Sequence, residues 1–237
     1  MNKTHADYIR GFKDGLPIGL GYLSISFGFG ITAVSLGLKA IYAIFISMTN
    51  LTSAGQVAGI SIIAASGTLL EIALTQLVIN LRYSLMGIAL SQRLERSYSW
   101  LHRLLSSFFI TDEIFAVAML KKAPVTPSYM YGLATLPYLG WAIGTTLGAL
   151  AGNILPQSVT TALGIAIYGM FIAIVVPPAK KDKGVALAVV VSILLNCAIR
   201  YIPAFSFITS GLAIIICAVA AALIGAAVKP LEEDYDE

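Results

Sequence analysis

The sequence predicts an all-α protein that crosses a membrane several times. Of its 237 residues, 58% are hydrophobic and only 11% are charged, whereas about 25% of the residues of a soluble domain are charged. The mean hydropathy is +0.86. Apolar runs recur along the chain, and several reach the roughly 20 residues that an α-helix needs to cross a bilayer. We therefore expect residues 1–237 to form a single polytopic membrane domain built from helices.

Six to eight apolar segments are expected in this domain. Polar or turn-forming stretches such as KKAPVTPS and PPAKKDKG separate them. The apolar segments lie at roughly 16–38, 41–66, 69–90, 104–120, 130–152, 159–178, 185–202 and 204–228.

The basic residues predict which ends of these segments face the cytoplasm, because short cytoplasmic loops are enriched in lysine and arginine. If every segment crossed once, the Arg93–Arg103 cluster would lie on the opposite side from the basic N-terminus. This conflict disappears if segments 41–66 and 104–120 are broken, re-entrant helices that enter the membrane and return. We then expect a cytoplasmic N-terminus and four cytoplasmic basic clusters: Lys3/Arg10/Lys13, Arg93/Arg96/Arg103, Lys121/Lys122 and Lys180/Lys181/Lys183.

The composition of the two segments favours such breaks. In SMTNLTSAGQ (47–56), six of ten residues carry a hydroxyl or an amide, and segment 104–120 has its charges in its middle. Irregular backbone at membrane depth is tolerated only where protein or a water-filled cavity surrounds it, and transporters bind substrate at such interruptions. The alternative is an unbroken helix over 41–66 whose polar residues bond to neighbouring helices.

Ionisable residues inside the apolar segments are the strongest functional signal. Each would cost roughly 2.5–3.5 kcal/mol at the bilayer centre, so each should face the bundle interior and find a partner. Glu71 and Arg82 share a helix but lie about 16 Å apart along its axis, so they cannot pair. We therefore expect Arg82 to pair with Asp112 or Glu113. Arg200 is the remaining charge of this kind.

Asp112 and Glu113 are adjacent, so on a helix their side chains point about 100° apart and cannot both face one partner. One can pair with Arg82 while the other exchanges a proton or binds a substrate ammonium group. Alternatively, Thr111 and Asp112 cap the helix that follows them. The candidate substrate-binding or coupling residues come from the membrane-embedded charges, the polar residues of the break in 41–66 and the Asn-Leu-Arg stretch. They are Asn50, Ser53, Gly55, Gln56, Glu71, Asn80, Arg82, Asp112 and Glu113.

Two further patterns concern packing and duplication. Gly11, Gly15 and Gly19, and likewise four glycines over 140–152, repeat every four residues, which is typical of closely packed membrane helices. INLRYSL (79–85) and LLNCAIRYIP (194–203) share an Asn followed by Arg-Tyr, 118 residues apart, and GLGYL (19–23) is similar to LGWAI (139–143). A duplication with halves 1–120 and 121–237 is a hypothesis that fits these matches.

Three stretches together resemble the AzlC family, the large subunit of bacterial branched-chain amino-acid exporters. They are GFKDGLPIGLGYLSISFGFG, SMTNLTSAGQVAGI, and LVINLRYSLMG followed by ITDEIFA. The chain departs from the family pattern where Tyr83 replaces a histidine and Leu51–Gln56 lacks an aromatic residue. Without an imidazole at residue 83, carboxylates are the remaining candidates for titration near neutral pH.

The resemblance implies a multi-pass protein of the bacterial inner (plasma) membrane that exports valine, leucine and isoleucine, with methionine as a further candidate. It also implies a small AzlD-type membrane subunit as partner. We expect the proton gradient to drive export. We expect no cofactor, no metal and no nucleic-acid partner. The alternatives are export of another small solute, a non-transporting scaffold subunit, or an enzyme that uses Asp112 and Glu113. We expect no enzyme, because the chain has no GxSxG, HExxH or nucleotide-binding motif.

Overall fold

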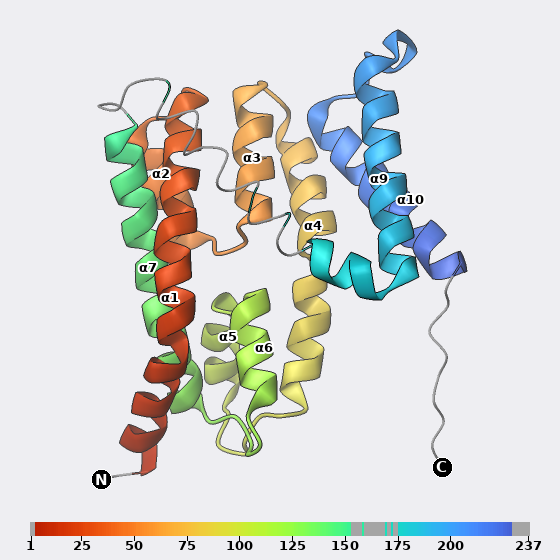
Figure 1. Ribbon diagram of the computed structural model, residues 1–237. Coiled ribbons are helices and arrows are strands. Elements are labelled where there is room, and N and C mark those ends of the chain that lie inside the picture. Colours follow the sequence, from red (N-terminus) through yellow and green to blue (C-terminus); the bar gives the residue numbers. More distant parts are fainter. Residues whose placement is uncertain (1–2, 153–157, 159–168, 170–171, 173–174, 229–237) are drawn as a thin grey trace. The chain divides into compact units, whose positions relative to one another are not determined.

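The computed structural model describes residues 3–152, 158, 169, 172 and 175–228, and the described chain is helical without strands. Its elements are α1 (Lys3–Ser35), α2 (Ala40–Thr49), α3 (Ala54–Ala64), α4 (Leu69–Ser91), α5 (Trp100–Phe108), α6 (Asp112–Leu120), α7 (Pro127–Ala151), α9 (Lys183–Tyr201), the 3₁₀ turn η1 (Pro203–Phe205) and α10 (Ser210–Val228) (Figure 1). Within the described residues, α1, α4, α7, α9 and α10 are long and apolar enough to cross a membrane. The all-α polytopic prediction is confirmed, and most of the predicted segment 159–178 lies outside the described residues.

The chain forms two compact units. The first contains residues 1–60 and 80–167, and the second contains residues 61–79 and 168–237. Helices α3 and α4 each contribute to both units. The proposed halves 1–120 and 121–237 divide the chain differently, so the duplication stays a prediction.

Glycines bring α1 and α7 into backbone contact in the first unit. A Cβ atom at Gly11 would overlap the carbonyl oxygen of Tyr129, and one at Gly148 would overlap that of Phe27. Because residue numbers rise together along both helices, α1 and α7 run parallel (Figure 1). The predicted glycine faces therefore hold this pair together through close packing, which is the main attraction between helices in lipid.

The predicted break in 41–66 is confirmed, and the alternative of an unbroken helix is wrong. Helix α2 ends at Thr49 and α3 begins at Ala54, turning back toward the end of the unit from which α2 came (Figure 1). Asn50 stabilises the break, because its Oδ1 accepts hydrogen bonds from Thr52 N at 3.1 Å and Thr52 Oγ1 at 2.6 Å. Ser53 adopts a φ of 39°, in the left-handed region, which costs a non-glycine residue free energy.

Helices α5 and α6 form a second hairpin, with its tip at Phe109–Thr111. The loop before α5 meets the loop after α6, because Leu94 bridges to Val125 and Arg93 Nη2 donates to the Lys121 carbonyl oxygen at 2.8 Å. The hairpin therefore enters and leaves at the same end of the unit, as the distribution of basic residues predicted.

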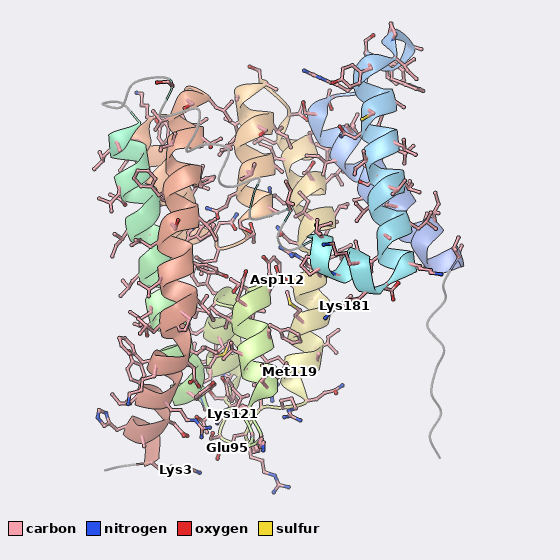
Figure 2. The ribbon with its side chains drawn as sticks, in the orientation of Figure 1. Lys3, Glu95, Asp112, Met119, Lys121 and Lys181 are labelled. Carbon is pink, nitrogen blue, oxygen red and sulfur yellow. The ribbon has the colours of Figure 1, made fainter. Side chains whose placement is uncertain are left out.

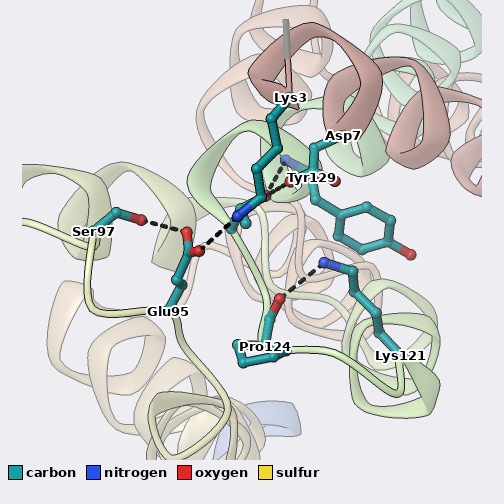
Figure 3. A network of polar contacts seen from close by, with 8 residues as sticks. Lys3, Asp7, Glu95, Ser97, Lys121, Pro124 and Tyr129 are labelled. Carbon is teal, nitrogen blue, oxygen red and sulfur yellow. Dashed lines mark hydrogen bonds and ion pairs between the residues drawn. The ribbon is translucent and has the colours of Figure 1, made fainter.

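A polar network ties the N-terminus of α1 to both of these loops (Figure 3). Lys3 Nζ lies 3.4 Å from Glu95 Oε1, and Thr126 Oγ1 donates to Asp7 Oδ2 at 3.0 Å. Lys121 is largely buried, donates to the Pro124 carbonyl oxygen at 2.9 Å, and has its pKa lowered by burial. Three of the four basic clusters therefore belong to segments that meet at one end of the first unit.

Candidate functional site

The two hairpin tips meet halfway along the α1–α7 pair. Tyr22 of α1, Leu51 of the α2–α3 break and Trp141 of α7 form a buried cluster, and Phe109 of the second tip packs against it. The rings of Tyr22 and Trp141 are arranged edge to face, with centroids 5.2 Å apart. The first unit thus brings both interrupted helices to one place.

Four helix ends face this meeting point. Helices α2 and α5 end there, and α3 and α6 begin there. The start of a helix favours negative charge and its end favours positive charge. Thr111 caps α6, because its Oγ1 accepts a hydrogen bond from Ile114 N at 3.3 Å. The threonine hydroxyl fills the capping position, so the carboxylate of Asp112 is left to other partners.

Arg82 of α4 pairs with Asp112, one of the two partners that the sequence suggested. Arg82 Nη1 lies 2.5 Å from Asp112 Oδ2, and Arg82 Nη2 donates to the Tyr83 hydroxyl at 3.1 Å. Each side chain of the ion pair is 37% exposed. Because charges in contact with hydrocarbon are costly, this face must line a water-filled cavity or contact protein. Figure 2 shows Asp112 at the end of α6 away from Lys121 and Glu95.

Glu113 has a different partner, which the sequence analysis missed. The Tyr22 hydroxyl donates to Glu113 Oε2 at 2.5 Å and lies 2.7 Å from Thr111 Oγ1. Adjacent acids on α6 therefore face different helices, α4 for Asp112 and α1 for Glu113. This divergence is what the 100° step between neighbouring helical residues requires.

A second polar cluster lies beside the break. Gln56 Nε2 donates to Ser47 Oγ at 3.1 Å, and Ser47 Oγ lies 2.7 Å from Thr145 Oγ1 of α7. Gln56 and Trp141 are each only 2% exposed. In the part of the chain that the structure describes, Gln56 Oε1 and Trp141 Nε1 are buried atoms with no hydrogen-bond partner.

The other predicted residues take several positions. Asn50 and Ser53 shape the break, and Gly55 is buried in the first turn of α3. Asn80 is half-buried on α4, two residues before Arg82. These residues all belong to the first unit.

Glu71 is the exception, because it lies in the second unit. Its Oε1 accepts a hydrogen bond from Gly211 N at 2.8 Å, at the start of α10, and the residue is 8% exposed. A carboxylate at this position satisfies an N–H group that has no partner within its own helix and complements the helix dipole. Glu71 thus has a structural partner of its own, apart from the acids of α6.

An apolar cavity of about 230 Å³ adjoins the second hairpin tip. It is lined by Phe109, Tyr131, Ala134, Thr135, Tyr138 and Leu139. Phe109 and Tyr138 also pack against the Tyr22–Trp141 cluster. No group of three or more potential metal ligands occurs among the described residues.

Interrupted helices with charged and polar groups at their breaks, within a multi-pass helical bundle, define a membrane transporter. The family model described as AzlC protein matches residues 17–155, and the chain belongs to the AzlC family.

Three relatives illustrate the relationship. The inner membrane protein YgaZ of Escherichia coli K12 is 29% identical over 228 residues, which cover 93% of this chain and 91% of that protein. An uncharacterized membrane protein of Archaeoglobus fulgidus is 30% identical over 177 residues, covering 74% and 77% of the two chains. The branched-chain amino acid transport protein AzlC of Bacillus subtilis 168 is 23% identical over 189 residues, covering 77% and 73%. No solved structure matches the chain.

Proposed function

We propose that the chain is a proton-driven exporter of branched-chain amino acids in the bacterial inner (plasma) membrane, with a cytoplasmic N-terminus. Its substrates are valine, leucine and isoleucine, with methionine as a further candidate, and a small AzlD-type membrane subunit completes the exporter. The observation that carries this proposal is the pair of adjacent acids at the start of α6, where both broken helices meet. The name of the Bacillus subtilis relative supports the substrate class.

The charges of the site suit a zwitterionic substrate. The starts of α3 and α6 favour a carboxylate, and the ends of α2 and α5 favour an ammonium group. The apolar cavity beside Phe109 suits an aliphatic side chain, which gains free energy on leaving water.

Glu113 is our candidate for exchanging the coupling proton. Arg82 neutralises Asp112, whereas Glu113 makes no ion pair within the described chain. The polar and charged groups around Glu113 are Tyr22 of α1, Thr111 and Asp112 at the start of α6, and Arg82 and Tyr83 of α4. None of these groups is an imidazole, so Glu113 is the acidic group of this set that has no cationic partner in the described chain.

The basic residues support the orientation. The clusters at the start of α1, before α5 and after α6 belong to segments joined by the network of Lys3, Glu95 and Lys121. An end that gathers lysine and arginine in short loops faces the cytoplasm.

Amino-acid efflux tests this function. Cells preloaded with dipeptides of leucine, valine, isoleucine, methionine or phenylalanine would express the chain with and without an AzlD-type subunit. Asp112→Asn and Glu113→Gln would be measured beside the wild type, with Tyr42→Phe, on an exposed face of α2, as the control. We expect efflux of branched-chain amino acids that needs the small subunit and is lost in Glu113→Gln.

Other results would point elsewhere. Efflux equal to that of empty cells, with both chains present in the membrane, would refute amino-acid export and favour another solute or a scaffold. Full efflux by both acid variants would remove the acids from the mechanism.

A further inference from the structure

We propose that the break between α2 and α3 binds the main-chain carboxylate and ammonium groups of the exported amino acid, through Trp141 Nε1 and Gln56 Oε1. This inference rests on the proposed function and assigns the atoms that recognise its substrate.

The first support is the state of these two atoms. Trp141 Nε1 is a donor and Gln56 Oε1 is an acceptor, and neither has a hydrogen-bond partner in the described chain although both residues are 98% buried. Folded proteins pair nearly all buried polar atoms, because leaving one unpaired costs free energy. An unpaired donor and an unpaired acceptor that border the same break therefore indicate a ligand that carries both kinds of group.

The second support is how the neighbours hold the two side chains. Gln56 Nε2 is bound to Ser47 Oγ, which in turn contacts Thr145 of α7, so Oε1 is the amide atom left for a ligand. Thr145 follows Trp141 by one helical turn and shares its face of α7. The indole ring also packs with Leu51, inside the break.

The third support is the backbone around these atoms. A carboxylate bound to Trp141 Nε1 would lie beside the start of α3, which favours negative charge, and an ammonium group at Gln56 Oε1 would lie beside the end of α2, which favours positive charge. The binding groups are all uncharged, so Arg82, Asp112 and Glu113 remain available for coupling.

Tyr22 connects the two functions. Its ring contacts Trp141, and its hydroxyl binds Glu113. A substrate that moves the indole ring would therefore act on the hydroxyl that holds the coupling carboxylate. This contact offers a direct route from amino-acid binding to proton exchange.

Inhibition of labelled L-leucine counterflow, in proteoliposomes that hold the complete exporter, tests the assignment. Unlabelled L-leucine, L-leucinol (without the carboxylate) and 4-methylpentanoate (without the ammonium group) serve as inhibitors. Trp141→Phe keeps the aromatic ring and removes the N–H, and Gln56→Met keeps the length and removes the oxygen. Tyr42→Phe, on an exposed face near the start of α2, is the control, because it removes a polar atom away from the break.

We expect each variant to lose only one contact. Trp141→Phe should weaken inhibition by leucine about tenfold and by leucinol less than twofold, because leucinol never offers the carboxylate. Gln56→Met should weaken inhibition by leucine about tenfold and by 4-methylpentanoate less than twofold. Tyr42→Phe should preserve the wild-type preference for leucine over both analogues.

A spectroscopic measurement tests the indole contact directly. The chain has two tryptophans, so Trp100→Phe leaves Trp141 as its sole tryptophan, which is excited selectively above the absorption of tyrosine. We expect L-leucine to shift its emission and leucinol to shift it much less.

Two results would overturn the inference, and they differ from failure of the function. Suppose that the wild type exchanges leucine and that every compound inhibits Trp141→Phe and Gln56→Met as strongly as it inhibits the wild type. The inference is then wrong and the proposed function stands. The inference is also wrong if Trp141→Phe weakens inhibition by leucine and by leucinol equally, or if Gln56→Met weakens inhibition by leucine and by 4-methylpentanoate equally. Equal losses of this kind indicate damaged packing. A wild type that exchanges no amino acid overturns the proposed function and the inference with it.

Discussion

The hydroxyl oxygen of Tyr22 lies 2.5 Å from Glu113 Oε2 and joins α1 to the tip of the second hairpin. The same hydroxyl lies 2.7 Å from Thr111 Oγ1, which caps α6. Tyr22 has one proton to donate, and a carboxylate is a stronger acceptor than a hydroxyl. The tyrosine therefore orients the carboxylate that we propose to exchange protons.

Removing that hydroxyl should slow export. In Tyr22→Phe the ring and its contact with Trp141 remain, and Glu113 loses its donor. A hydrogen bond to a charged group contributes about 1.5–3 kcal/mol, so we expect the export rate to fall roughly tenfold or more. Initial rates of leucine efflux would measure the change, with Tyr42→Phe as control. An unchanged rate in Tyr22→Phe would separate this hydrogen bond from transport.

Arg82 should not be replaceable by lysine. Its guanidinium group bridges two partners, with Nη1 on Asp112 and Nη2 on Tyr83, and it lies over the Tyr83 ring at 4.9 Å. A lysine ammonium group can pair with Asp112 but does not reproduce the planar fork or its stacking. We expect Arg82→Lys to keep about a tenth of the wild-type efflux rate and Arg82→Ala to lose nearly all of it.

A double-mutant cycle locates the cause of that loss. Tyr83→Phe removes the hydroxyl that Arg82 Nη2 binds. If the bridge matters, Tyr83→Phe should lower efflux in the wild type and add little in Arg82→Lys. Additive losses would show that lysine fails for a reason unrelated to Tyr83.

Glu71 should behave as a structural residue. Its carboxylate caps α10 through Gly211 N, and Thr75 Oγ1 donates to the Gly211 carbonyl oxygen at 3.4 Å. Losing a cap costs about 0.5–2 kcal/mol, so Glu71→Ala should lower the melting temperature in detergent, whereas Glu71→Gln, which keeps an acceptor, should lower it less. The leucine KM should stay unchanged in Glu71→Gln. A changed pH dependence of export in that variant would return Glu71 to the coupling residues.

Much of the architecture followed from the sequence for simple reasons. The composition predicted the fold class. The position of the Arg93–Arg103 cluster predicted that segments 41–66 and 104–120 are hairpins whose two ends lie on the same side. The Arg82–Asp112 pair followed from the cost of a lone charge in the membrane. Each of these predictions uses local composition or a strong energy penalty, both of which a single sequence carries.

The residues that the sequence did not indicate depend on how helices pack. Tyr22 lies in GLGYL and Trp141 lies in LGWAI. The sequence indicated only that these two stretches are similar, not that the two side chains meet. Their contact is decided by the parallel pairing of α1 and α7, where Gly19 meets Gly140. The Glu71 contact with Gly211 joins residues 140 positions apart. The glycine repeats mark a close helix contact without naming its partner, and the contact of Glu71 with Gly211 leaves no periodic signal in the sequence.

Two helix starts in the structure resemble each other, and the duplication itself stays a prediction. Helices α6 and α10 both follow a Phe-Ile-Thr sequence, at 109–111 and 207–209. Thr209 Oγ1 accepts from Leu212 N at 3.4 Å, as Thr111 does from Ile114 N. In the first unit the acids follow the threonine directly, whereas in the second Glu71 of α4 supplies the carboxylate. A threonine caps both helix starts, and a carboxylate lies beside each of them. The carboxylate comes from α6 itself in the first unit and from α4 in the second.

The pair of Lys3 and Glu95 should make a small contribution to stability that depends on pH. The Ser97 hydroxyl donates to Glu95 at 2.8 Å, and this bond, followed by Lys3 at 3.4 Å, lowers the pKa of Glu95. A lowered pKa in the folded state means that the contribution is present above the ordinary value of 4.5 and is lost as the pH falls through the folded value. The difference in melting temperature between wild type and Glu95→Gln should therefore be small at pH 7 and vanish in acid. A difference that grows in acid would contradict this assignment.

The contact between α1 and α7 should tolerate no added side-chain atoms. A Cβ at Gly15 would overlap the Leu133 carbonyl oxygen, and one at Gly144 would overlap Ser26 Oγ. Overpacking typically costs about 1–3 kcal/mol, so Gly15→Ala and Gly144→Ala should each lower the melting temperature by several degrees. Gly21 is the matched control on α1, because a Cβ there meets no atom within 4 Å. Gly21→Ala should be neutral or stabilising by up to about 1 kcal/mol. Equal melting temperatures for all three variants would mean that α1 and α7 are not held in backbone contact.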